Sequence, residues 1–234
     1  MSRGLFITGT GTGVGKTYVA ALIARKLTST GKRVGVYKPV ASGCELRDGI
    51  LQSTDAVALW EAAGRPGTLE QVCPQRFAVA VAPHLAARVE GRRVDQQQLR
   101  SGLDFWRESC DVVLVEGAGG LMSPVSDDDY NADLADEFGH PLIVVAANVL
   151  GTINATLQTL IVADTFRDGL KIAGIVLNTP RLVVGDSSVE SNADELVRRC
   201  VPPLLAEVEY GGGIETDADW WALADSKQSG HRAE

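Results

Sequence analysis

The sequence contains no apolar run that approaches the roughly 18 to 20 residues needed to span a membrane. Its first residues lead directly into an apolar segment, without the basic region and hydrophobic region of a secretory signal. We therefore expect a cytoplasmic protein that does not bind membranes.

Clusters of metal-binding residues are also missing. The 4 cysteines are widely spaced without a C-x-x-C pair, and the 3 histidines are scattered. They are Cys44, Cys73, Cys110 and Cys200, and His84, His140 and His231. This spacing argues against a disulfide framework and a zinc site, and indicates reduced thiols.

Positive charge is scarce as well. The chain has 22 basic against 30 acidic residues, a formal net charge of −8, and no run of lysine or arginine. Nucleic acid and anionic membranes are therefore unfavourable partners. A protein of this charge that binds a polyphosphate must gather its cations locally, so lysines beside glycine loops are the first candidates.

The apolar segments of the 234 residues are of two alternating kinds. Five short β-branched runs are typical of strands buried on both faces: 5–7, 34–37, 112–115, 142–145 and 172–177. Helical apolar spacing occurs at 15–29, 55–63, 95–108, 131–138, 152–166 and 189–200. We predict one α/β domain with a mostly parallel sheet, helices on both faces, and ligands beyond the carboxyl ends of the strands.

The end of the chain has a different composition. After the three glycines at 211–213 it becomes acidic and aromatic around Trp220 and Trp221, and then polar. We predict a nucleotide-binding domain at 1–212 and a C-terminal tail at 213–234 that is partly disordered.

A glycine-rich loop, residues 9–17, lies between the first predicted strand and the first predicted helix. Such loops wrap phosphates with backbone N–H groups, while the lysine (Lys16) reaches the β- and γ-phosphates and the hydroxyl (Thr17) binds Mg²⁺. The strict pattern opens with glycine at position 10, where Thr10 stands, so the opening glycine is Gly9. A flexible turn with a chance lysine is disfavoured by the flanking strand and helix. The sequence therefore predicts a P-loop NTPase fold that binds ATP and Mg²⁺.

Three charged residues adjoin other predicted elements. Lys38 closes the strand at 34–37, where it either stabilises charge on a transferring phosphoryl group or is a surface lysine. Glu116 follows the strand at 112–115 and is placed to bind Mg²⁺. Asp55 is either a metal ligand or a helix N-terminal residue, and taken alone the second interpretation is favoured.

Two further strand ends carry polar groups. The helix opening at 151–154 has free N–H groups for a carboxylate, although an ordinary turn capped by Thr152 is an equal alternative. Asn178 follows the strand at 172–177 and has an amide able to pair with an adenine edge. An asparagine before Thr-Pro is also common in turns.

Together these motifs resemble the dethiobiotin synthetase family. The resemblance runs in order from residue 4 to about 208, and rests on segments 8–17, 37–43, 54–56, 82–84, 115–120 and 150–154. It implies an ATP- and magnesium-dependent ligase of biotin biosynthesis that joins carbon dioxide to 7,8-diaminopelargonate, giving dethiobiotin, ADP and phosphate. A carbamate on one amine attacks the γ-phosphate to form a carbamic-phosphoric anhydride, and the second amine closes a cyclic urea.

The resemblance also implies residue roles. Catalysis falls to Lys16 and Lys38, and Mg²⁺ binding to Thr17, Asp55 and Glu116. The nucleotide-binding residues are Gly13, Val14, Gly15, Lys16, Thr17, Tyr18, Asp55, Glu116, Gly117, Ala118, Gly119 and Asn178. The substrate-binding residues are Ser42 at the diamine end, Pro83, and, for the carboxylate, Gly151, Thr152, Ile153 and Asn154. In the family this last helix belongs to the partner subunit, which implies a homodimer with its active site at the interface.

The chain departs from the family pattern in three places. Many members have an acidic residue where Gly13 stands, and a histidine is usual where Ala155 stands. Residues 207–210 read Glu-Val-Glu-Tyr in place of the usual Glu-Ile-Pro of the base-binding loop. ATP is the expected nucleotide, and a broader base preference stays open.

Two other functions share this loop. A regulatory ATPase of the partition or septum-positioning class carries an extra lysine near the start of the loop, where this chain has Gly11. The septum type also has a membrane-targeting amphipathic helix at its C-terminus, which the acidic tail does not supply. A free-standing cobyrinate-type synthetase domain is a minor alternative, because such enzymes append a glutaminase domain for which 234 residues leave no room.

Overall fold

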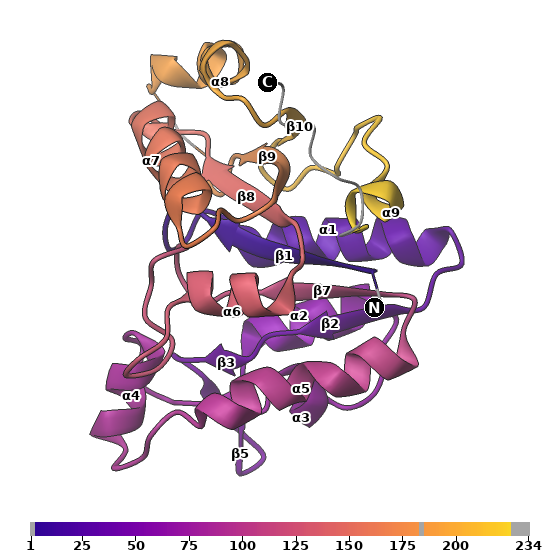
Figure 1. The fold of residues 1–234 in the computed structure, drawn as a ribbon, viewed down its shortest axis with the longest axis vertical. Helices are drawn as coiled ribbons and strands as arrows, with labels where there is room; N and C mark the ends of the chain where they lie inside the picture. Colours follow the sequence, from indigo (N-terminus) through magenta and orange to yellow (C-terminus); the bar gives the residue numbers. More distant parts are fainter. Residues whose placement is uncertain (1–2, 183–184, 226–234) are drawn as a thin grey trace.

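Six parallel strands form the central sheet of the structure, a computed structural model that describes residues 3–182 and 185–225. The strands are ordered β10-β9-β8-β1-β7-β2, and every neighbouring pair is parallel. Their bounds are Arg3–Gly9 (β1), Val34–Tyr37 (β2), Val112–Glu116 (β7), Leu142–Ala147 (β8), Ile172–Asn178 (β9) and Leu204–Val208 (β10). Figure 1 shows the sheet between helices.

The five predicted strands are all present, because each is an apolar run that can be buried on both faces. Leu5, Phe6 and Ile7 of β1, for example, have no exposed surface. The sequence pattern did not predict β10. This strand lies at the edge of the sheet, where Glu207 is exposed and the leucines at its start are only half-buried, so its apolar run is interrupted.

The six predicted helices are present within a few residues of their predicted bounds. They are α1 (Lys16–Ser29), α2 (Thr54–Ala62), α5 (Gln96–Ser109), α6 (Asn131–Phe138), α7 (Thr152–Thr165) and α8 (Asn192–Arg199). Helix α1 contacts β1, β2, β7 and α2, whereas α5 contacts α6 and α7 contacts α8. The helices α1 and α2 form one group, and α5, α6, α7 and α8 form the other. Because crossovers between parallel strands are right-handed, the two groups cover opposite faces of the sheet. None of the described helices is long and apolar enough to cross a membrane.

Short elements connect these helices and strands. They are β3 (Val40–Ala41), which pairs with β6 (Gln75–Arg76), the hairpin β4 (Glu45–Arg47) and β5 (Ile50–Gln52), the helices α3 (Leu69–Val72), α4 (Pro83–Val89) and α9 (Trp220–Leu223), and a 3₁₀ turn, Ser187–Glu190. Elements of two to seven residues contain too few positions for a hydrophobic period, which is why the sequence pattern does not predict them.

The segment after the three glycines packs on the domain as far as residue 225. Ile214 and Trp220 are each 4% exposed, and the backbone N–H of Gly4 donates to the carbonyl of Ala224 at 2.9 Å. Arg3 forms an ion pair with Asp225 at 3.0 Å. The domain boundary near residue 212 stays a prediction, and the predicted disorder of the tail falls partly on residues 226–234, which lie outside the described residues.

His140 makes the stability of the fold depend on pH. Burial, with a smaller contribution from the charge of Arg107, lowers the pKa of His140 to about 4. In the unfolded chain the pKa is about 6.5, so below that pH the unfolded state binds more protons than the folded state. We therefore expect the free energy of unfolding to fall by about 2 kcal/mol between pH 7 and pH 5 on account of this residue.

Urea unfolding of the parent chain and of His140→Gln at pH 7 and pH 5 measures this contribution. The variant should lose less stability than the parent on going to pH 5. His84→Gln, at a half-buried histidine, is the matched control. An equal pH response of the parent and His140→Gln would contradict the assignment.

Candidate active site

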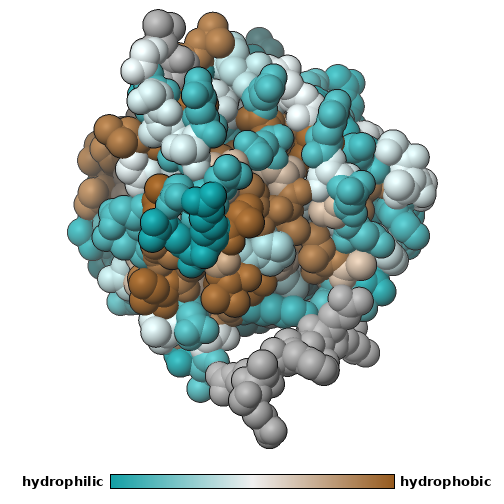
Figure 2. Space-filling model, turned by 90° about the horizontal axis from the view of Figure 1, so that it is seen from above, coloured by the Kyte–Doolittle hydropathy of each residue, from teal (hydrophilic) through white to brown (hydrophobic). Residues whose placement is uncertain are grey.

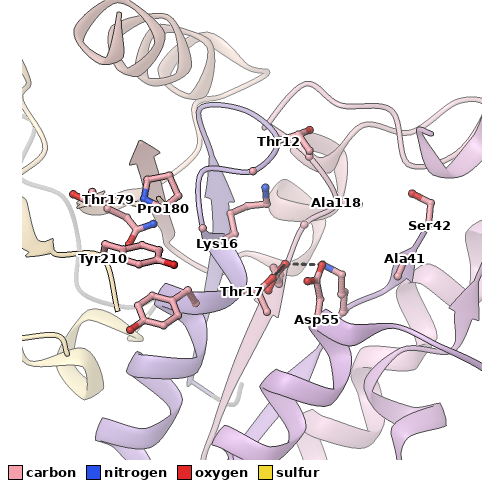
Figure 3. A pocket seen from close by; sticks show the side chains of 18 of the residues that line it. Thr12, Lys16, Thr17, Ala41, Ser42, Asp55, Ala118, Thr179, Pro180 and Tyr210 are labelled. Atoms are coloured by element: carbon pink, nitrogen blue, oxygen red, sulfur yellow. Dashed lines mark hydrogen bonds and ion pairs between the residues drawn. The ribbon is translucent and has the colours of Figure 1, made fainter. Parts of the chain in front are cut away.

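A cavity of about 700 Å³ opens at the carboxyl ends of β1, β2, β7 and β9. Its lining comes from the glycine loop and the start of α1, from the ends of those strands, from α2, and from the loop after β10. Figure 3 shows Thr179, Pro180 and Tyr210 on one side of Lys16 and Thr17, and Ala41 and Ser42 on the other. The cavity is therefore elongated, with the glycine loop at its centre.

The glycine loop ends at the first turn of α1, and the geometry of that turn suits an anion. Gly15 precedes the helix at a φ of 91° and provides no side-chain hydrogen bond to the first helical N–H groups. Those N–H groups are thus free to bind phosphate oxygens, and the helix dipole favours negative charge at this end. Lys16, 7% exposed, donates to the carbonyl of Gly11 at 3.1 Å.

A second lysine lies among carboxylates at the centre of the cavity. The Nζ of Lys38 is 2.6 Å from Oε1 of Glu116 and 3.0 Å from Oδ2 of Asp55, and the Lys38 side chain is 5% exposed. Burial by itself would lower the pKa of Lys38, but Glu116 and Asp55 raise it above its ordinary value. Lys38 is therefore a fixed positive charge, and not the surface lysine that was its alternative interpretation.

The charges of this cluster also shift the pKa values of its other members. Burial would raise the pKa of Asp55, but the neighbouring Lys38 holds it below its ordinary value. Burial lowers the pKa of Lys16. The charge of Glu116 opposes this lowering, and the charge of Lys38 adds to it. The N-cap of α2 is Ser53, which accepts from the N–H of Ala56 at 3.2 Å. Asp55 thus lies in the first turn of α2 as a helix N-terminal residue without being its N-cap, and its carboxylate forms an ion pair with Lys38.

The oxygen atoms beside Lys38 fit a magnesium ion. Oε1 of Glu116 accepts from Lys38 and, at 2.9 Å, from the hydroxyl of Thr17. The Glu116 residue is only 1% exposed, and its Oε2 is buried without a hydrogen-bond partner. A buried carboxylate oxygen without a partner is costly, and a hard cation would satisfy it. Together with Asp55 and Thr17, Glu116 offers the oxygen ligands that Mg²⁺ prefers.

Asn178 closes one end of the cavity. Its Nδ2 donates to the carbonyl of Val14 at 2.9 Å, whereas its Oδ1 is buried without a partner. The amide therefore offers a ligand an acceptor at Oδ1, while the Val14 carbonyl uses one of its two N–H donors. Val14 itself is buried and is not among the residues that line the cavity.

Several residues of this end were missed by the sequence pattern. They are Thr179, Pro180, Tyr210 and Gly211, and, elsewhere in the cavity, Thr12 and Ala41. Thr179 and Pro180 directly follow β9, so the rule that ligands lie beyond strand ends could have found them. Tyr210 and Gly211 follow β10, which the pattern did not predict. The family resemblance pointed to the loop at 207–210, and no signal pointed to Gly211.

Ser42 lies at the other end of the cavity, next to β3. Pro83 begins α4, is buried, and is not among the residues that line the cavity. Of the predicted site residues, those brought together in this cavity are Gly13, Gly15, Lys16, Thr17, Tyr18, Lys38, Ser42, Asp55, Glu116, Gly117, Ala118, Gly119 and Asn178.

The predicted carboxylate site at the start of α7 lies outside this cavity. None of the residues 151–154 lines it, and the preceding N–H, that of Leu150, donates to Asp186 at 2.8 Å. Further along α7, Ala155 and Gln158 line a separate cavity of about 300 Å³ on the other side of the glycine loop. Thr12 lines both this cavity and the first one. Within one chain, the start of α7 and Ser42 therefore do not meet.

Comparison with known proteins gives both sequence and fold relatives. A family model described as an AAA domain matches residues 3–216. The ATP-dependent dethiobiotin synthetase BioD of Rhodopirellula baltica is 47% identical over 219 residues, covering 89% of this chain and 84% of that protein. The synthetase of the same name from Anaeromyxobacter dehalogenans is 42% identical over 196 residues, covering 84% and 85%.

Among solved structures, the septum site-determining protein MinD of Pyrococcus horikoshii, complexed with Mg-ADP, has a TM-score of 0.52 and 20% identity, covering 89% of this chain and 82% of that chain. At that identity the likeness concerns the fold alone. It confirms the predicted P-loop NTPase fold with a mostly parallel sheet.

Proposed function

Because the chain belongs to the ATP-dependent dethiobiotin synthetase family, we propose that the central cavity is where ATP, carbon dioxide and 7,8-diaminopelargonate react. The enzyme forms dethiobiotin, ADP and phosphate. The observation that carries the assignment of the cavity is the cluster of Lys38, Asp55 and Glu116 beside the glycine loop, between two separate ends of one elongated space.

The reaction needs three bond changes. Carbon dioxide adds to one amine, which loses a proton and becomes a carbamate. A carbamate oxygen then attacks the γ-phosphorus while the bond to ADP breaks, which gives the carbamic-phosphoric anhydride. The second amine attacks the carbonyl carbon, loses a proton, and expels phosphate with the electron pair of the C–O bond, which closes the five-membered urea.

We assign the two ends of the cavity to the two reactants. The end with Ser42 holds the diamine, whose amines lie within reach of a phosphoryl group at the glycine loop. The end with Asn178 and Tyr210 holds the nucleotide base. The unpartnered Oδ1 of Asn178 accepts from the exocyclic amino group of adenine.

The chain's own cations stabilise the phosphoryl transfer. Lys16 and Lys38 face the space beside the α1 N-terminus, where charge develops on the transferring group. Lys38 keeps its proton throughout, because Glu116 and Asp55 raise its pKa. Thr17, Asp55 and Glu116 hold Mg²⁺, which supplies charge neutralisation to the phosphate oxygens when bound.

The substrate carboxylate is assigned to residues 151–154 of a second copy of the chain. These residues begin a helix of 14 residues and lie outside the chain's own cavity, which is consistent with a contribution from a partner subunit. A homodimer with its active site at the interface, and a cytoplasmic location, are parts of this proposal. In this proposal Pro83 acts only indirectly. It begins α4, next to the loop in which the carbonyl of Val79 accepts from the N–H of Gly43.

The alternative functions are not favoured. The likeness to septum-positioning ATPases is confined to the fold, whereas relatives named as dethiobiotin synthetases match most of the chain at 42% to 47% identity. Neither a regulatory switch nor a cobyrinate-type synthetase domain has comparable support.

One assay tests the proposed function. Purified protein is given ATP, Mg²⁺, bicarbonate and 7,8-diaminopelargonate, and phosphate release is followed. We expect release to require the diamine and to be matched by formation of the cyclic urea, detected by mass spectrometry. Release at the same rate without the diamine would refute the function.

A further inference from the structure

One side chain of α1 reaches across the nucleotide end of the cavity. Tyr18 directly follows Lys16 and Thr17 in the first turn of α1, and its hydroxyl donates to the carbonyl of Gly212 at 2.6 Å. The two residues are 194 positions apart in the chain. Tyr18 lines the cavity and is 38% exposed, so the bond forms at the mouth of the cavity and not in the core. Figure 2 shows the surface of the molecule seen from above, at right angles to the view of Figure 1.

The carbonyl that Tyr18 binds belongs to the loop after β10, residues 209–213. The loop starts where the N–H of Thr179 donates to the carbonyl of Val208 at 2.8 Å, and it turns where the N–H of Gly212 donates to the carbonyl of Glu209 at 2.9 Å. Tyr210 and Gly211, at the tip of this turn, line the cavity. Figure 3 shows Tyr210 beside Thr179 and Pro180, across from Lys16.

The tip of this loop has few contacts with the rest of the described chain. Tyr210 is 56% exposed, and a Cβ added at Gly211 would meet no other atom within 4 Å. Among the residues that the structure describes, Tyr18 provides the side-chain hydrogen bond that joins this loop to another part of the chain. The position of the wall formed by Tyr210 and Gly211 therefore depends on a residue of the phosphate-binding helix.

We propose that Tyr18 is a positioning residue for nucleotide binding, which holds the loop at 209–213 against the base through its bond to Gly212. The inference rests on the proposed function only in assigning this cavity to a nucleotide. In this arrangement the first turn of α1 binds phosphate with Lys16 and Thr17, and the next residue, Tyr18, fixes the loop that faces the base. Tyr18 then acts through the loop, and not by a contact of its own with the phosphates.

Tyr18→Phe tests this, because it removes the hydroxyl and keeps the ring. Losing one partly exposed hydrogen bond corresponds to a change of about three- to ten-fold. We expect the Kd for Mg-ATP, measured by calorimetry, and the KM for ATP to rise by about that factor. The kcat at saturating ATP and the KM for the diamine should stay close to those of the parent. Tyr130→Phe, at a tyrosine 42% exposed that does not line the cavity, is the matched control.

Inorganic tripolyphosphate separates a role at the base from a role at the phosphates. It has no base, so its affinity should be the same for the parent and for Tyr18→Phe. An equal loss of affinity for tripolyphosphate and ATP would overturn the proposal, as would an unchanged Kd for ATP.

A double-mutant cycle with Tyr210→Ala separates action through the loop from direct contact with the nucleotide. If Tyr18 acts through the loop, the two substitutions together cost less ATP affinity than the sum of their separate effects. Additive effects would contradict the proposal. These binding measurements need no diamine, so a chain that binds ATP but shows no diamine-dependent turnover would refute the proposed function and leave this inference standing or falling on its own data.

Discussion

Lys38→Met is expected to lower kcat for diamine-dependent phosphate release by about 100- to 1,000-fold or more. The ammonium of Lys38 is buried between Glu116 and Asp55, at 2.6 Å and 3.0 Å, and its pKa is raised, so its charge is fixed at the point where we propose that the phosphoryl group is transferred. Methionine keeps the length of the side chain and removes the charge. Steady-state kinetics with saturating ATP and diamine measure the loss.

The same substitution is expected to destabilise the fold. Glu116 is 1% exposed, and without Lys38 its buried carboxylate loses its counter-ion, which costs about 3–5 kcal/mol. The double variant Lys38→Met/Glu116→Gln removes both charges and should recover much of the stability. Urea unfolding of the two variants therefore measures the cost of the unpaired carboxylate.

Lys26→Met is the matched control, since Lys26 is exposed in the last turn of α1. It should change neither kcat nor stability. If Lys38→Met kept a kcat close to that of Lys26→Met, the catalytic role of Lys38 would be wrong.

Gly15→Ala should reduce kcat/KM for ATP by about 100-fold. Gly15 has a φ of 91°, which is unfavourable for alanine by about 1–2 kcal/mol. In addition, a Cβ at this position would overlap the amide of Asn178. That amide is 1% exposed and is bonded to the carbonyl of Val14, so it cannot move aside without displacing the glycine loop.

Gly13→Ala is a control for the backbone strain that alanine causes at a positive φ, apart from any steric overlap. Gly13 has a φ of 75°, but a Cβ there would meet nothing within 4 Å. Its loss in kcat/KM should reflect the strain alone, which corresponds to about ten-fold. Calorimetric titration with Mg-ATP checks both variants. Equal losses in the two would show that the contact between Gly15 and Asn178 does not matter.

Much of the fold could be predicted from the sequence because its central elements are marked by local patterns. Strands such as β7 and β8 are buried on both faces and therefore appear as continuous apolar runs. The same runs indicated the site, since Lys38, Glu116 and Asn178 each follow or close such a strand. All three line one cavity.

The parts that could not be predicted are short or lie at an edge. The β10 strand has an interrupted apolar run, so the apolar pattern did not place the loop with Tyr210 and Gly211 at the end of a strand, and only the family resemblance pointed to residues 207–210. The tail composition likewise gave no sign that Trp220 is buried, because acidic residues surround it in the sequence while its contacts come from elsewhere in the fold.

By itself, the sequence determined the phosphate-binding loop, the order of strands and helices in the chain, and the identity of the charged residues at the strand ends, since each depends on neighbours within a few positions. Only the tertiary structure decided how those residues combine. Asp55 lies in the first turn of α2 and is also a partner of Lys38, because Ser53 caps the helix and α2 lies beside β2. Tyr18 reaches Gly212 because parallel strands bring the ends of β1 and β10 to one edge of the sheet, whatever their distance along the chain.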